Sequence, residues 1–124
     1  MKNRCHFVSN SSSTSFIILY DKSNAANVDG FNLTVDKFLD SIDIFSSHYS
    51  DETEIISFDK NEIIDRLENY EYADEVDKEI VKKLKQSSKN AAYFSISNHH
   101  SILKDLFNFL KYHNAIEVID ERDE

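Results

Sequence analysis

The sequence predicts an α/β fold: a small mixed or parallel sheet of four to five strands, packed with about four helices. Apolar runs of strand length alternate with segments whose apolar residues recur at helical spacing. The 124 residues fit one domain, and 40% of them are hydrophobic, which is enough to form a core. Because a helix between two strands commonly joins parallel neighbours, we expect right-handed crossovers. An α+β arrangement is the alternative, since residues 91–97 and 115–120 have the pattern of half-exposed strands.

The first third of the chain contains one strand and one helix. Residues 16–20, FIILY, form a continuous apolar run, typical of a strand that is covered on both faces. Residues 6–8 form a possible extra strand, which would make the serines between the two strands a hairpin loop. Residues 22–33 carry turn residues and the single glycine, so we expect a connection. A helix follows over 34–49, with Thr34 as its N-cap.

The middle of the chain predicts one strand and two helices. Residues 53–59 have strand character, and Asp59 is expected to cap a helix over 59–72. The next segment, 73–89, begins with acidic residues and continues with lysines. That order complements the helix dipole and supports a second helix.

The last part of the chain completes the pattern and gives no sign of a second domain. We expect a strand over 91–97, a helix over 101–113 and a strand over 115–120. The acidic tail, 121–124, is expected to fray. Residues 1–124 are thus predicted to form a single domain.

The composition excludes several classes of protein. The chain has one glycine and no proline, so glycine-rich phosphate loops of the Walker or Rossmann type are absent. The net charge is −9, from 23 acidic and 14 basic residues, which disfavours direct binding of nucleic acid and favours basic partners. Acidity that only keeps the protein in solution is the simpler interpretation. The sequence has no apolar stretch of membrane-spanning length and no signal-peptide pattern, and Cys5 is its only cysteine, so we expect a cytoplasmic protein without membrane contact.

A stretch of small polar residues, 9–15, precedes the first apolar strand. Consecutive backbone amides and hydroxyl groups in a turn can bind an anion, so this stretch is a candidate site for a phosphate or nucleotide. The stretch contains no Lys or Arg, and the same residues are ordinary in a connecting loop. The candidate ligand-binding residues are Asn10, Ser11, Ser12, Ser13 and Thr14.

Catalytic and metal sites find little support in the sequence. A catalytic serine would need a base, and His6 is the only histidine near the serines. Asp21, Asp59 and Asp120 follow apolar runs and could hold Mg²⁺ at the carboxyl ends of parallel strands. They are better explained as a turn residue, a helix N-cap and part of the acidic tail, respectively. We therefore expect no catalytic residues, no metal and no cofactor.

The acidic residues of the two middle helices suggest a surface for a partner. Glu62, Asp65 and Glu68 recur every three residues, and such like charges weaken their own helix by a few tenths of a kcal/mol. A stripe of this kind is useful if it faces a basic partner, although a solvated helix face has the same pattern. Nearby tyrosines could anchor an interface. The predicted partner-binding residues are Glu62, Asp65, Glu68, Glu71, Asp74, Glu75, Tyr70 and Tyr72.

Residues 7–18, FVSNSSSTSFII, resemble the N-terminal signature of many small uncharacterised phage and prophage proteins. The resemblance implies a protein made in a bacterial cytoplasm from a viral genome, and it assigns no role to individual residues. In that setting we expect a binding protein that occupies a basic surface of a host or defence protein in place of nucleic acid. A small-ligand protein that uses the serine stretch is the alternative, and an assembly role through self-association stays open, as does the oligomeric state.

Overall fold

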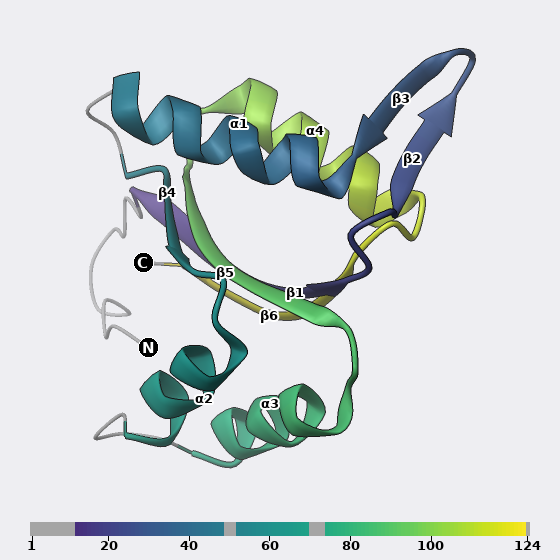
Figure 1. The fold of residues 1–124 in the computed structure, drawn as a ribbon. Helices are drawn as coiled ribbons and strands as arrows, with labels where there is room; N and C mark the ends of the chain where they lie inside the picture. Colours follow the sequence, from purple (N-terminus) through teal and green to yellow (C-terminus); the bar gives the residue numbers. More distant parts are fainter. Residues whose placement is uncertain (1–11, 49–51, 70–73, 124) are drawn as a thin grey trace.

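The computed structural model describes residues 12–48, 52–69 and 74–123. Within these ranges it has four helices, one four-stranded sheet and one two-stranded sheet, which confirms the predicted α/β class (Figure 1). The elements in chain order are β1 (Ser13–Tyr20), β2 (Ala25–Val28), β3 (Phe31–Thr34), α1 (Val35–His48), β4 (Glu54–Ser57), α2 (Lys60–Glu68), α3 (Glu75–Gln86), β5 (Asn90–Ser97), α4 (Ser101–Tyr112) and β6 (Glu117–Asp123).

The main sheet has the order β4-β5-β1-β6, and each neighbouring pair is antiparallel. The expectation of a mixed or parallel sheet is therefore wrong. Strands β1 and β4 run in the same direction, but β5 lies between them, and β1 likewise separates β5 from β6. This is a split β-α-β connectivity. Helix α1, between β1 and β4, and helix α4, between β5 and β6, thus each return the chain to a non-neighbouring position in the sheet.

Helices cover both faces of this sheet, giving three layers (Figure 1). Helices α1 and α4 pack on one face, over a core rich in phenylalanine that includes Phe16, Phe38, Phe94 and Phe107. Helices α2 and α3 cover the other face with a smaller cluster of aliphatic residues. Alternate residues of β1 supply both cores, as expected for a strand that is buried on both faces.

The serines nearest the apolar run belong to β1 and are not in a loop. Ser13, Thr14 and Ser15 lie in the strand and are buried. Ser13 stands opposite Ser97 of β5, and Ser15 stands opposite Ser95, so the polar end of one strand pairs with the polar end of the next. The prediction that residues 13–15 form a connection is therefore wrong. Residues 6–8 lie outside the described part of the chain.

Two further segments differ from the sequence-based expectation. The segment 22–33, expected to be a connection, contains the hairpin of β2 and β3. Its turn has positive φ at both central residues, 51° at Asp29 and 87° at Gly30, as a type I′ turn requires. The tail, expected to fray from residue 121, continues β6 as far as Asp123, and Thr14 pairs with that residue across the ladder.

Candidate protein-binding surface

The acidic face predicted on the first middle helix is present on α2. The chain enters this helix through Asp59, whose carboxylate accepts the backbone N–H groups of Asn61 and Glu62 at 2.9 and 3.4 Å. Ile63, Ile64 and Leu67 face the core, which leaves the carboxylates on the solvent side. Glu62, Asp65 and Glu68 are all exposed there.

The cap at Asp59 is expected to stabilise α2. Replacing Asp59 with Ala leaves two N–H groups of the first turn without their acceptor, so we expect the free energy of unfolding to fall by about 1 kcal/mol. Urea denaturation followed by circular dichroism measures this loss. Asp21→Ala is the matched control, since the Asp21 side chain accepts no hydrogen bond within the described residues. Equal losses in the two variants would contradict the capping role.

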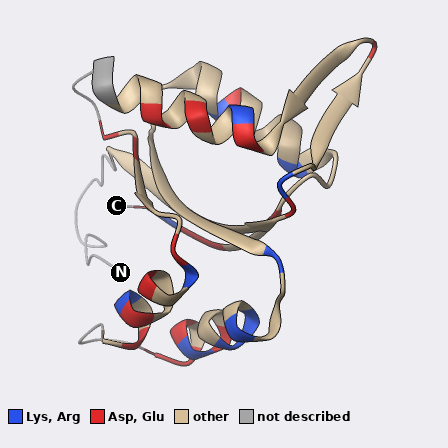
Figure 2. Cartoon of the chain, in the orientation of Figure 1, with Lys and Arg blue, Asp and Glu red and all other residues tan. Residues whose placement is uncertain are grey.

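Lys and Arg residues lie among the acidic residues of α2 and α3 (Figure 2). Glu62 lies 3.9 Å from Arg66 on the same helix, and Glu68 lies 3.1 Å from Lys85 of α3. These pairs are about half exposed, and exposed pairs contribute little to stability. The Asp65 carboxylate accepts a hydrogen bond from the Asn69 side chain at 2.6 Å. Basic groups of a partner can therefore replace these internal contacts at little cost in free energy.

The second part of the predicted site lies at the start of α3. Asp74 caps this helix, and it shares a capping box with Asp77, each side chain accepting the other's backbone N–H at 3.1 Å. Glu75 is exposed and pairs with Lys78 at 3.2 Å. Asp74 thus has a structural role in addition to its charge. The predicted residues Tyr70, Glu71 and Tyr72 lie outside the described part of the chain.

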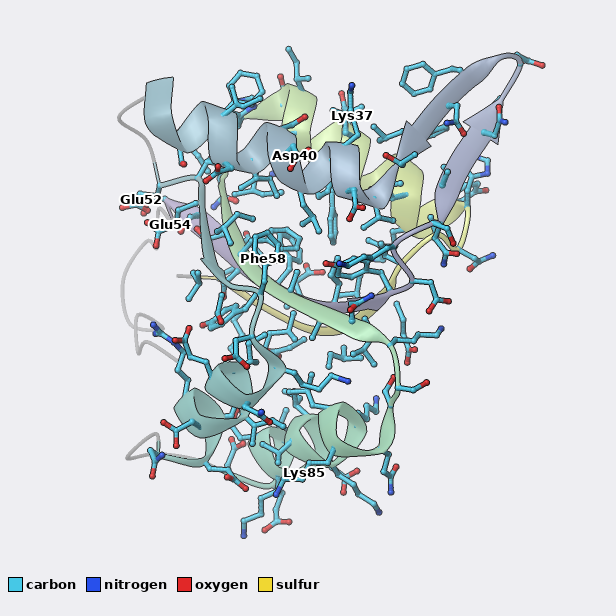
Figure 3. All side chains as sticks on the ribbon, viewed as in Figure 1. Lys37, Asp40, Glu52, Glu54, Phe58 and Lys85 are labelled. Carbon is cyan, nitrogen blue, oxygen red and sulfur yellow. The ribbon has the colours of Figure 1, made fainter. Side chains whose placement is uncertain are left out.

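A groove of about 640 Å³ lies between α2 and α3. Leu67 and Val81 contribute apolar surface to it, one from each helix. Glu68 lies on the α2 side, and Lys82 and Lys85 lie on the α3 side. Lys85 points away from the sheet at the outer side of α3 (Figure 3). No single amphipathic pattern in the sequence identifies this groove, because its two walls come from separate helices.

The residues of the alternative site, the serine stretch, lie on both faces of the sheet. Ser13 and Thr14 are consecutive residues of β1 and therefore face opposite sides of the sheet. The Thr14 hydroxyl, which has one proton to donate, lies 2.9 Å from Asn98 Oδ1 and 3.0 Å from Asp123 Oδ1, and the Ser12 hydroxyl donates to Glu52. Acidic or amide acceptors thus occupy these hydroxyl groups, which argues against an anion site. Asn10 and Ser11 lie outside the described residues.

A buried charge cluster joins the start of α3 to β6. Arg122 pairs with Asp77, and its Nε lies 2.9 Å from Asp120. Burial acts to raise the pKa of Asp77, but hydrogen bonds from Arg122 and from the backbone N–H of Asp74 outweigh it, and the pKa falls below its ordinary value. Burial raises the pKa of Asp120 despite the attraction of Arg122. Both carboxylates pair with the same guanidinium. The cluster therefore holds α3 and β6 together and offers no open anion site.

The aspartates expected at one sheet edge are separated. In the antiparallel sheet Asp21 and Asp59 follow strands that run in one direction, whereas Asp120 lies within β6, which runs the other way. Within residues 12–48, 52–69 and 74–123, no three His, Cys, Asp or Glu side chains are grouped so as to hold a metal ion. Within the same residues, no helix is both long and apolar enough to cross a membrane.

Comparisons with protein-family models, with curated proteins and with solved structures find no match to this chain. The function is therefore inferred from the charges, the groove and the contacts described above.

Proposed function

We propose that this protein acts by binding a protein partner, whose basic groups face the carboxylates of α2. The observation that carries the proposal is the position of Glu62, Asp65 and Glu68 on one exposed side of a helix that also borders an apolar groove. The net charge of −9 favours the approach of a basic partner. Charge alone gives little affinity at an exposed surface, so the groove is needed to supply contact area.

The groove between α2 and α3 gives the interface an apolar centre. Its volume of about 640 Å³ is in the range that binds apolar side chains or small ligands. A partner side chain that enters it would contact Leu67 and Val81 while neighbouring basic groups reach Glu68. Lys82 and Lys85 on the opposite side attract acidic groups, so the two sides together define one orientation of the partner.

We propose a class of partner and not an individual protein. The resemblance of residues 7–18 to phage and prophage proteins supports a bacterial host protein or defence protein, met in the cytoplasm, whose basic surface otherwise binds nucleic acid. Occupying such a surface requires no catalytic residue.

Removal of the α2 carboxylates tests the proposal. The variant Glu62→Gln, Asp65→Asn, Glu68→Gln keeps the side-chain shapes and removes three negative charges. We expect the wild-type protein to capture a discrete partner from bacterial lysate at low salt and to lose it at high salt, because exposed charges are screened over about 10 Å at 0.1 M. The variant should capture at least tenfold less of it, roughly the loss of one good charged contact.

A second variant with the same charge change controls for net charge. Asp29→Asn, Asp105→Asn, Glu117→Gln removes three exposed carboxylates from the β2–β3 turn, α4 and β6. We expect it to capture the partner as the wild type does. Equal loss in both variants would show non-specific attraction to an acidic protein, and full capture by the α2 variant would place the interface elsewhere.

A further inference from the structure

A second pocket, of about 350 Å³, opens at the edge of the sheet between α1 and the end of β4. Asp36 and Asp40 line it from the first two turns of α1, and Phe58 lines it from the residue after β4. Figure 3 shows Asp40 on α1 and Phe58 below it. Strand β4 pairs with β5 only as far as Ser57, opposite Tyr93, so the start of β5 borders the pocket without β4 beside it.

Tyr20, the last residue of β1, also lines this pocket. The residue has a relative exposure of 5%, yet within the described residues no hydrogen bond engages its hydroxyl. No buried polar side-chain atom of the described residues lacks a partner, so the Tyr20 hydroxyl keeps some exposure to solvent. Burial, and secondarily the charge of Asp36, raise the pKa of Tyr20, which keeps it a neutral phenol.

These groups have the chemistry of a site for an organic cation. Two carboxylates and a phenol oxygen accept hydrogen bonds, and the exposed ring of Phe58 offers a π face. A guanidinium suits them better than an ammonium group, because it is planar, binds carboxylates through paired N–H groups and stacks on aromatic rings. The carboxylates disfavour an anion, and the aromatic ring disfavours a hydrated metal ion.

We propose that this pocket binds the guanidinium group of an arginine side chain on a partner protein. The partner's basic character is taken from the function proposed above, and the inference rests on it in that respect. Phe58 directly precedes Asp59, the cap of α2, so the pocket adjoins the start of the α2 surface. One basic partner can therefore place an arginine here while its other basic groups face α2.

Lys22 is the one cation that lines the pocket. Its replacement therefore tests the proposal through an expected gain in affinity. Within the described residues no ion pair joins Lys22 to Asp36 or Asp40. Its ammonium group therefore opposes a bound guanidinium. Lys22→Gln should strengthen binding several-fold, whereas loss of either carboxylate should weaken it.

Titration of the ¹⁵N-labelled full-length chain with N-acetyl-arginine N-methylamide, followed by NMR, measures binding to this pocket. We expect saturable shifts at the amides of Tyr20, Asp40 and Phe58. The citrulline analogue has nearly the same shape without the charge and should cause none. Asp36→Asn or Asp40→Asn should each raise the Kd about tenfold, the effect of one hydrogen bond to a charged group. Tyr20→Phe should raise it several-fold.

Asp43→Asn is the matched control, since Asp43 is exposed one turn further along α1 and does not line the pocket. Equal binding of the citrulline analogue, equal weakening by Asp43→Asn, or absence of saturable shifts would overturn the proposal. The α2 triple variant should bind the arginine probe as the wild type does. Probe binding that fails while partner capture through α2 succeeds would therefore remove this pocket and leave the proposed function standing.

Discussion

Replacing Arg122 with Met is expected to lower the free energy of unfolding by about 3–5 kcal/mol, the usual cost of breaking a buried ion pair from one side. Arg122 is the shared partner of Asp77 and Asp120, and their side chains are only 4% and 12% exposed. Without the guanidinium, the buried Asp77 carboxylate and the largely covered Asp120 carboxylate lack their cation. A loss of this size is a large part of the stability of a small domain.

The effect of Arg122→Met depends on pH in a defined direction. In the wild type the pKa of Asp77 lies below its ordinary value of 3.8, so its contribution to stability is present above that pH and is lost as pH falls through the lowered pKa. In the variant both carboxylates lose the attraction that favours ionisation, and protonation relieves them. The difference between the two proteins should therefore be largest near pH 7 and shrink as pH falls and the carboxylates of the variant take up protons.

Arg66→Met is the matched control for this prediction. It makes the same substitution in an exposed pair, in which Arg66 and Glu62 are 54% and 51% exposed. Urea denaturation at several pH values should show a change within about 0.5 kcal/mol for this variant. If Arg122→Met were equally mild at pH 7, the cluster would not hold β6 to α3.

Replacing Phe94 with Ala is expected to lower the free energy of unfolding by about 3–5 kcal/mol. Phe94 is fully buried at the centre of the larger core. Its ring centroid lies 5.6 Å from that of Phe16, 5.9 Å from Phe38 and 6.0 Å from Phe107. The substitution removes the ring that these three share, and it leaves a cavity between the sheet and its two covering helices.

Phe31→Ala makes the same change on the β2–β3 hairpin, where Phe31 is 53% exposed and contacts only one other ring, Phe109, among the ring contacts of the described residues. We expect its loss to stay below about 1 kcal/mol, since it removes little buried area. Thermal or urea unfolding of the two variants distinguishes the roles. Similar losses would contradict the placement of Phe94 at the centre of the core.

Helices were the most predictable part of this fold, because each signal is local. Asp59 caps α2, and the acidic start and lysine-rich end of α3 agree with its observed limits. Local patterns also predicted the apolar part of β1. The relative direction of the strands does not follow from any local sequence pattern. A β-α-β order in sequence fits parallel neighbours and split, antiparallel arrangements alike, and the choice depends on packing of the whole chain.

Polar strands were the least predictable part. Ser13 and Ser15 of β1, and Arg122 of β6, lie in paired strands although their sequence is typical of loops and tails. The Ser15 hydroxyl donates to the carbonyl oxygen of Arg122, and the Arg122 guanidinium pairs with Asp77, and only tertiary contacts reveal that. The β2–β3 hairpin did have a local signal. The Asp29-Gly30 pair between Val28 and Phe31 favours a type I′ turn.

The candidate surfaces also differ in how far the sequence predicts them. The spacing of Glu62, Asp65 and Glu68 is a property of one helix, so their shared exposed side was predictable. The α2–α3 groove and the pocket of Tyr20, Asp40 and Phe58 each combine elements distant in the chain. No spacing rule identifies such combinations before the fold is known.

Carbodiimide cross-linking of the captured complex is the most direct test of the α2 surface, because it joins a carboxylate only to an amine that lies in contact with it. The Glu68–Lys85 pair, at 3.1 Å, provides an internal positive control within the chain. Mass spectrometry should identify bonds from Glu62, Asp65 or Glu68 to lysines of the partner. Bonds formed only by carboxylates on α4 or β6, with none from α2, would contradict the proposed interface.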